Sequence, residues 1–211
     1  MEKQKTLNIF HIIIYIFFAV GAAGHFIAFT KPVMLYMTPY VLAIAGVFVL
    51  GFSGSIKNNK FILFFIISFL MTFTLEVAGV KTGMIFGKYT YGDVLGYKVA
   101  AVPVIIGFNW IFVILGALNI GIILSRNTLF VCLAAGILSV VFDMLLEPAA
   151  INLDYWSWHN NVVPFQNYAA WFIISFIFAF SFLYFKVNVY SKTFIHYFIA
   201  QLMFFIILNY Y

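Results

Sequence analysis

Long apolar segments alternate with short polar connections along the whole chain. Each apolar segment is close to the ~20 residues that an α-helix needs to cross the hydrocarbon core of a bilayer. The pattern therefore predicts an all-α fold, a polytopic integral membrane helical bundle of about seven transmembrane helices. Their expected ranges are about 8–29, 33–52, 61–80, 99–124, 128–148, 168–189 and 193–210.

The polar connections are too short to fold by themselves, so residues 1–211 are predicted to form a single transmembrane helical domain. The first apolar segment follows Lys3 and Lys5, as the apolar part of a secretory signal peptide would. It is longer than such a part and continues to Phe29, which favours a helix that is retained in the protein.

Composition agrees with this pattern and excludes several classes of protein. Hydrophobic residues make up 65% of the chain and charged residues only 8%, which is not typical of a soluble domain. The net charge of +5 is spread over the connections and indicates membrane topology rather than nucleic-acid binding. Cys132 is the single cysteine, so neither a disulfide framework nor a cysteine metal site is expected.

Basic residues are unevenly divided between the two sides of the predicted bundle. Successive helices alternate in direction, so the connections before helices one, three, five and seven share the side of the N-terminus. Seven lysines and arginines lie on that side and four on the other, and the positive-inside rule then predicts a cytoplasmic N-terminus in the cell (inner) membrane. The seven are Lys3, Lys5, Lys57, Lys60, Arg126, Lys186 and Lys192, and the four are Lys31, Lys81, Lys88 and Lys98.

Acidic residues within the predicted helices gather at the side opposite the N-terminus. Glu76 lies near the end of the third helix, and Asp143 and Glu147 lie near the end of the fifth. Because a helix rises 1.5 Å per residue, each lies within about 5–15 Å of that interface. Ionisable groups inside a membrane are costly, so their segregation predicts a single functional site there. Other polar or aromatic residues expected on this side are His25, Asn109, Trp110 and Trp171.

Asp143 and Glu147 are four residues apart, so they share one helix face, about 6 Å from each other. Burial and a neighbouring carboxylate both favour the protonated form of a carboxyl group. One member of the pair is therefore a candidate proton donor. The alternative is that both only form hydrogen bonds that hold the bundle together.

Several other chemistries are not supported by the residues present. The four histidines are far apart and fall on both sides of the membrane, so a histidine metal site is not expected. The chain contains no phosphate-binding loop, no dinucleotide-binding glycine motif and no G-x-S-x-G motif. Acid catalysis in an apolar pocket remains.

An ordered set of motifs runs from Glu76 to Trp171, over nearly half of the chain. The motifs are E-x-x-G-x-x-T-G-x-x-F-G-x-Y-x-Y from Glu76 to Tyr91, a stretch from Pro103 to Trp110, D-x-x-x-E-P from Asp143 to Pro148, W-x-W at Trp156 and Trp158, and P-x-x-N-Y-x-x-W from Pro164 to Trp171. This set resembles the CruF-type carotenoid biosynthesis family of membrane proteins, the carotenoid hydratases.

The resemblance implies addition of water to the terminal isopropylidene (1,2) double bond of an acyclic carotenoid end, giving a tertiary alcohol. Protonation of this alkene produces a tertiary cation, which each desolvated aromatic face stabilises by up to about 2 kcal/mol. We expect Asp143 to be the acid and Glu76 or Glu147 the base, with the reverse assignment open. The expected substrate-binding residues are Asn109, Trp110, Tyr89, Tyr91, Trp156, Asn167 and Trp171.

This reaction requires no cofactor and no metal, so the enzyme class expected is a cofactor-independent hydro-lyase. Its expected partners are a carotenoid, water and membrane lipid, with other carotenoid biosynthesis enzymes as further candidates and no nucleic acid. Two alternatives stay open. A carotenoid cyclase would use the same protonation and then lose a proton. A small lipid or solute transporter would need an acid pathway to both faces, and no polar residues are expected to balance the set on the opposite face.

Overall fold

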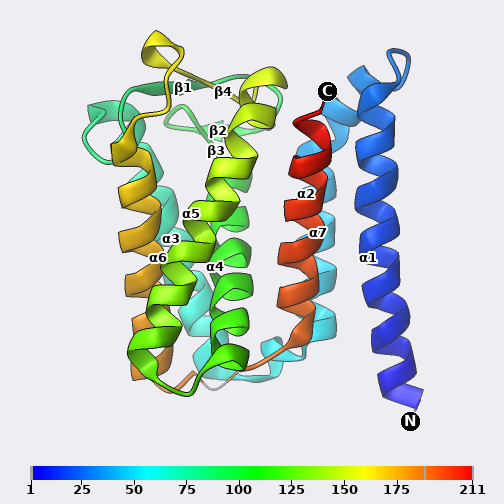
Figure 1. The fold of residues 1–211 in the computed structure, drawn as a ribbon, viewed down its shortest axis with the longest axis vertical. Coiled ribbons are helices and arrows are strands. Elements are labelled where there is room, and N and C mark those ends of the chain that lie inside the picture. The colour runs from blue at the N-terminus through cyan, green and yellow to red at the C-terminus, as the bar shows by residue number, and fades with distance from the viewer. Residues whose placement is uncertain (1, 188, 211) are drawn as a thin grey trace.

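The computed structural model describes residues 2–187 and 189–210. Within them the chain forms seven α-helices that run side by side (Figure 1). The predicted all-α membrane bundle is confirmed, because six of these helices are long and apolar enough to span a membrane. The helices are α1 (Glu2–Phe26), α2 (Lys31–Ser53), α3 (Asn59–Thr82), α4 (Val104–Leu124), α5 (Thr128–Asn152), α6 (Phe165–Tyr184) and α7 (Lys192–Leu208).

The seventh helix is shorter than the others. α7 has 17 residues, fewer than the ~20 of a typical spanning helix. It is apolar along its length and packs against α1 and α4 inside the bundle. α7 is therefore too short to count among the six candidate membrane spans. It nevertheless runs beside those helices as part of the bundle (Figure 1).

Several predicted boundaries differ from those found, and three of them lie next to prolines. α4 begins at Val104 rather than near 99, because Pro103 disfavours helical backbone in the residue before it. α5 continues through Pro148 to Asn152, so this proline lies inside the helix, although it lacks an N–H for the helical hydrogen bonds. α6 begins directly after Pro164, which brings Asn167 into its first turn.

Two small antiparallel sheets, absent from the predictions, lie at one end of the bundle, the upper end in Figure 1. One pairs β1 (Tyr89–Tyr91) with β4 (Trp156–Trp158), and the other pairs β2 (Lys98–Val99) with β3 (Val102–Pro103). Two short 3₁₀ turns, η1 (Ser55–Lys57) and η2 (His159–Asn161), complete the secondary structure.

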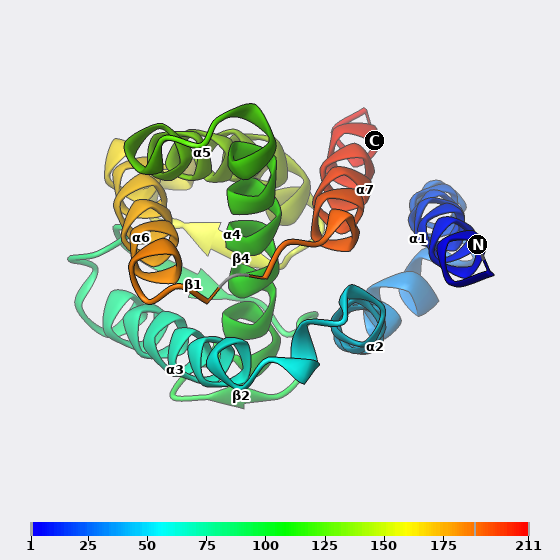
Figure 2. The ribbon, with the colours of Figure 1, turned by 90° about the horizontal axis from the view of Figure 1, so that it is seen from below.

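α4 is the central helix, and most of its side chains are buried. It packs against α3, α5 and α7, while α5 also packs against α6. Seen from below in Figure 2, α3, α4, α5 and α6 surround the projection of β1 and β4. The β1–β4 sheet therefore closes the upper end of a four-helix group, and α1 lies outside that group against α2 and α7.

Candidate active site

The β1–β4 sheet joins the connection between α3 and α4 to the connection between α5 and α6, and aromatic residues occur in both. Tyr89 is opposite Trp158, and Tyr91 is opposite Trp156. Because side chains alternate along a strand, these four rings lie on one face of the sheet. The residues between them, Thr90 and Ser157, are exposed on the other face, where their hydroxyl oxygens are 3.0 Å apart. The alternation thus turns four aromatic side chains toward the helices.

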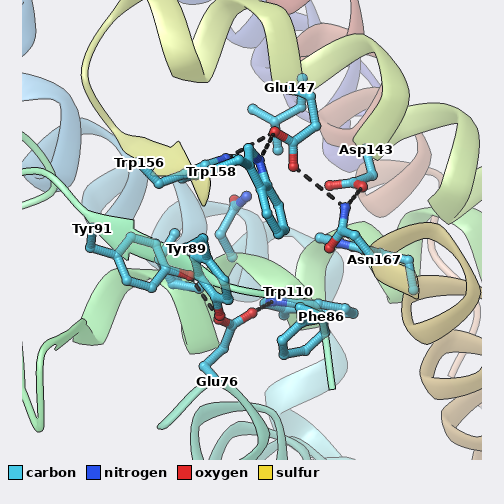
Figure 3. Close-up of a pocket in the computed structure, with 14 residues that line it drawn as sticks. Glu76, Phe86, Tyr89, Tyr91, Trp110, Asp143, Glu147, Trp156, Trp158 and Asn167 are labelled. Carbon is cyan, nitrogen blue, oxygen red and sulfur yellow. Dashed lines mark hydrogen bonds between the residues drawn. The ribbon is translucent and has the colours of Figure 1, made fainter. Parts of the chain in front are cut away.

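Glu76 accepts three hydrogen bonds at the end of α3. The Tyr89 and Tyr91 hydroxyls donate to its Oε2 atom at 2.5 and 2.7 Å, and the Trp110 indole donates to Oε1 at 2.6 Å. The carboxyl group is buried, with only 4% of Glu76 exposed. Its donors come from β1 and from α4, so this side chain connects three elements (Figure 3).

The two phenols act as donors at neutral pH. Burial raises the pKa of the Tyr89 and Tyr91 hydroxyls above the ordinary value, and the neighbouring Glu76 charge raises it further. Both hydroxyls therefore keep their protons and present them to the carboxylate.

Glu147 is held from the other strand of the sheet. The indoles of Trp156 and Trp158 donate to its Oε2 atom at 2.9 and 2.7 Å. The Asn167 amide lies 3.4 Å from the second oxygen, Oε1. Trp156 and Trp158 were part of the W-x-W motif, and their spacing of two places both indoles on the same side of β4.

Asp143 has one strong hydrogen bond. The Asn167 amide nitrogen donates to its Oδ2 atom at 2.5 Å. Asp143 is 1% exposed and lies one helical turn before Glu147 on α5. Asn167 therefore bridges the two carboxyl groups, as Figure 3 shows, and Asp143 meets fewer donors than Glu76 or Glu147.

A small cavity of about 50 Å³ lies among these groups. A cavity needs about 10–15 Å³ to hold one water molecule, so it has room for a few waters but not for a branched hydrocarbon end group. The side-chain oxygen Oδ1 of Asn109, one of its lining residues, is buried and has no hydrogen-bond partner among the described residues. That oxygen is a natural acceptor for a bound water.

All ten residues predicted from the sequence line this cavity. The structure brings them together from four helices, α3, α4, α5 and α6, and from strands β1 and β4. Their catalytic and binding roles stay predictions. Four lining residues were not in the predicted set: Phe86, Ile106, Leu146 and Trp158. Trp158 could have been found from its alternation with Trp156, whereas Ile106 and Leu146 carry no signal beyond ordinary apolar sequence.

Trp110 and Trp171 form a stacked pair in the cavity wall. Their ring centroids are 3.4 Å apart and their planes differ by 10°. This stack joins α4 to α6 and fixes the Trp110 ring, whose N–H donates to Glu76. Four of the residues predicted to bind substrate donate a hydrogen bond to a carboxylate: Tyr89, Tyr91, Trp110 and Trp156. Their role in substrate binding stays a prediction.

His25 does not join this group. It was expected at the same site, but it lies on α1 and lines a different cavity, between α1, α2 and α7. The reason is that α1 packs outside the four-helix group. His25 therefore lies at the same end of the bundle as the three acids but not close to them.

The opposite end of the bundle is more polar than predicted. His11 Nε2 lies 3.1 Å from the Thr193 hydroxyl, and Asn119 accepts a hydrogen bond of 2.9 Å from the Ser191 backbone. The first contact joins α1 to α7, and the second joins α4 to the segment before α7. The segregation predicted from sequence holds for the buried acids of the described chain, and it is wrong for neutral polar residues.

No cluster of three or more histidine, cysteine or acidic side chains suited to a metal ion is present among residues 2–187 and 189–210. What the cavity offers is three carboxyl groups, amide groups and aromatic rings in a largely apolar space. Such groups support proton transfer to and from an apolar molecule.

Comparisons with known proteins agree with this chemistry at the level of the family. A curated protein, the bisanhydrobacterioruberin hydratase of Haloarcula japonica, is 30% identical over 112 residues, which are 49% of this chain and 38% of that protein. The chain thus aligns with well under half of the length of this relative. No solved structure matches the chain. The family described as "Carotenoid biosynthesis protein" matches residues 11–210, nearly the whole chain. The chain therefore belongs to the carotenoid biosynthesis protein family.

Proposed function

We propose that this protein is a carotenoid hydratase, which adds water across the terminal isopropylidene (1,2) double bond of an acyclic carotenoid end. The observation that carries the proposal is a cavity with room for a few waters. It lies between Asp143, Glu147 and the side-chain oxygen of Asn109, which has no hydrogen-bond partner among the described residues. Family membership supplies the substrate class, and the similar hydratase of Haloarcula japonica supports the reaction type.

Asp143 is the acid in this proposal. It meets a single strong donor, Asn167, and is the least constrained of the three buried carboxyl groups. Its proton passes to C2 of the alkene, the π bond breaks and a tertiary cation forms at C1. Protonation by a well-positioned acid contributes typically 10²–10⁴-fold to a rate.

Glu147 is the base. Water held near Asn109 attacks C1, and Glu147 accepts one of its protons, so that a C–O bond forms and one O–H bond of water breaks. The proton then returns to Asp143, which is one helical turn away and shares the Asn167 amide with Glu147. The sum is one alkene and one water converted to one tertiary alcohol, with no oxidant or reductant.

Glu76 stabilises the cation rather than transferring a proton. Its two oxygens accept from Tyr89, Tyr91 and Trp110, so they are held in place by donors. A fixed carboxylate in a closed cavity attracts a positive charge that develops nearby. The faces of the surrounding aromatic rings add cation–π attraction.

An apolar groove of about 440 Å³ between α3 and α6 suits the polyene chain. Leu63, Ile67 and Met71 of α3 and Phe178 of α6 form part of its walls. Phe178 lies about two helical turns from Trp171 on the same side of α6. In this proposal the polyene lies along the groove, and the wall at Trp171 moves to admit its end.

The test is hydration by the purified protein in lipid nanodiscs, with lycopene as the acyclic substrate, H₂¹⁸O as solvent and no added cofactor. We expect a product heavier by one water and labelled with ¹⁸O. Asp143→Asn should lower the rate by at least 10²-fold. Asp93→Asn is the matched control, because Asp93 is fully exposed and paired with Lys98, away from the cavity.

Other results would contradict the proposal. An isomer of unchanged mass with a shortened chromophore would mean a cyclase. Unchanged pigment in the presence of folded protein would mean that lycopene hydration is not its activity. Full activity in Asp143→Asn would show that the acid is assigned to the wrong residue.

A further inference from the structure

A second cavity, of about 240 Å³, lies between α1, α2 and α7. Figure 2 shows these three helices next to one another, on the side of α4 away from α6. Phe17, Val20 and Met37 line the cavity and are partly exposed on the outer surface of the bundle. In a membrane protein that surface faces lipid, so a ligand would arrive from the bilayer.

His25 places an unused acceptor in this apolar cavity. Its Nδ1 lies 2.7 Å from the Gly21 carbonyl oxygen. A carbonyl only accepts, so Nδ1 carries the proton and, in the neutral ring, Nε2 carries a lone pair. Nε2 is buried and has no hydrogen-bond partner in the described part of the chain. Buried acceptors without partners are rare in native structures, which indicates a ligand with a donor group.

Tyr155 supplies a donor at the same cavity. Its ring lines the cavity and its hydroxyl is buried, without a well-formed hydrogen bond to any described residue. Burial raises the pKa of this hydroxyl to about 12, and the nearby Thr38 hydroxyl opposes that effect in part. Tyr155 therefore keeps its proton at neutral pH and can donate to an oxygen.

The second cavity adjoins the candidate active site. Tyr155 precedes Trp156, whose indole donates to Glu147 in the first cavity. The ring centroids of Tyr155 and Trp156 are 6.3 Å apart. These two consecutive residues thus form part of a wall between the cavities: Trp156 lines the cavity that holds the acids, and Tyr155 lines the cavity that holds His25.

We propose that the cavity between α1, α2 and α7 binds the hydroxylated end of a polyene, with the alcohol donating to His25 and accepting from Tyr155. This inference rests on the proposed function, because the alcohol is the product of that reaction. The apolar walls suit the hydrocarbon part of the molecule. An end without a hydroxyl leaves Nε2 of His25 unpaired, so the cavity discriminates product from substrate.

The experiment compares two pigments on the full-length Asp143→Asn protein, in which the proposed hydration is blocked. Nanodiscs holding this protein are mixed with equal amounts of lycopene and 1-hydroxylycopene, repurified, and the retained pigments are quantified by chromatography. We expect the alcohol to be enriched about threefold to tenfold, the effect of one net hydrogen bond. Adding His25→Leu should bring the ratio close to one without abolishing retention.

Two further variants complete the design. Gly21→Leu should also lower the enrichment of the alcohol, because it fills the cavity that Gly21 lines. His11→Leu is the matched control on the same helix, since His11 contacts Thr193 at the other end of the bundle. It should leave the enrichment unchanged.

Equal retention of both pigments by the parent protein, or enrichment that survives His25→Leu, would overturn the inference. A copurified bilayer lipid that neither pigment displaces would also overturn it, since the occupant would then be lipid. Enrichment of the alcohol by a protein whose wild type hydrates nothing would contradict the proposed function alone.

Discussion

Three buried carboxyl groups share one cavity, yet each meets a different set of donors. Glu76 accepts from three neutral donors, Glu147 from two indoles and a more distant amide, and Asp143 from one amide. A hydrogen bond to a charged group contributes about 1.5–3 kcal/mol, so Glu76 is held most firmly. Three carboxyl groups in one cavity are therefore held differently by their neighbours.

Trp110→Phe tests the role of a single donor. The change removes the N–H that donates to Glu76 at 2.6 Å and keeps an aromatic ring in place. Loss of about 1.5–3 kcal/mol predicts a 10- to 150-fold lower hydration rate in nanodiscs. Trp171→Phe is the control, because it keeps all three donors of Glu76 and shortens only the stacked partner. Equal losses in both variants would mean that stacking, not the hydrogen bond, matters.

Among the elements, the short β1–β4 sheet supplies most of the hydrogen-bond donors to the carboxyl groups of the site. It has three residues per strand, and it brings four of the five side chains that bond to Glu76 and Glu147 at under 3 Å. Backbone bonds extend the pairing at both ends, from Gly92 to Tyr155 (3.0 Å) and from His159 to Lys88 (2.9 Å). The sheet, called the clamp below, thus positions the donors against Glu76 near the end of α3 and Glu147 near the end of α5.

Gly92→Ala tests this element. A Cβ at this position would overlap the backbone carbonyl of Asp154, which cannot move without separating the two connections. We expect the hydration rate to fall at least tenfold while helix content, measured by far-UV circular dichroism, is unchanged. Gly51→Ala is the matched control, since a Cβ there meets nothing within 4 Å. Unchanged activity in Gly92→Ala would show that the clamp is not required.

At the scale of the whole molecule, the bundle depends on close contact between α4 and its neighbours. A Cβ on Gly116 of α4 would overlap the Phe198 side chain and lie 3.0 Å from the Phe194 carbonyl oxygen, both on α7. The glycine therefore allows α7, the shortest helix, to pack directly on the central helix. The position of α7 in turn sets one wall of the second cavity.

Gly116→Ala should destabilise the bundle by about 1–3 kcal/mol, because overpacking forces α7 away from α4. The buried thiol of Cys132 reports on this change, since it is 0% exposed in the folded chain. We expect a maleimide to label Cys132 at a lower temperature in Gly116→Ala than in wild type. An identical labelling temperature in the two proteins would show that α7 accommodates the methyl group.

The sequence by itself determined the fold class, the helices and the end of the bundle where acids gather. These features follow from local physics: about 20 apolar residues fit a bilayer, and an acid within such a segment is costly. The same reasoning, with the resemblance in the motifs, selected ten residues that line one cavity. Helix ends near Pro103 and Pro148 were less certain, because proline can either stop a helix or sit within it.

Only the tertiary structure decided which groups meet. Tyr89 and Trp158 are 69 residues apart in number and adjacent across a strand pair, a contact that no local pattern encodes. His25 has the same depth as Glu76 but lies beyond α4, in another cavity. The hydrophobic pattern determines how deep in the bilayer a residue lies, because the free energy of placing a side chain in lipid depends on its depth along the membrane normal. Side-chain packing between helices fixes its neighbours, and those neighbours distinguish one carboxyl group from another.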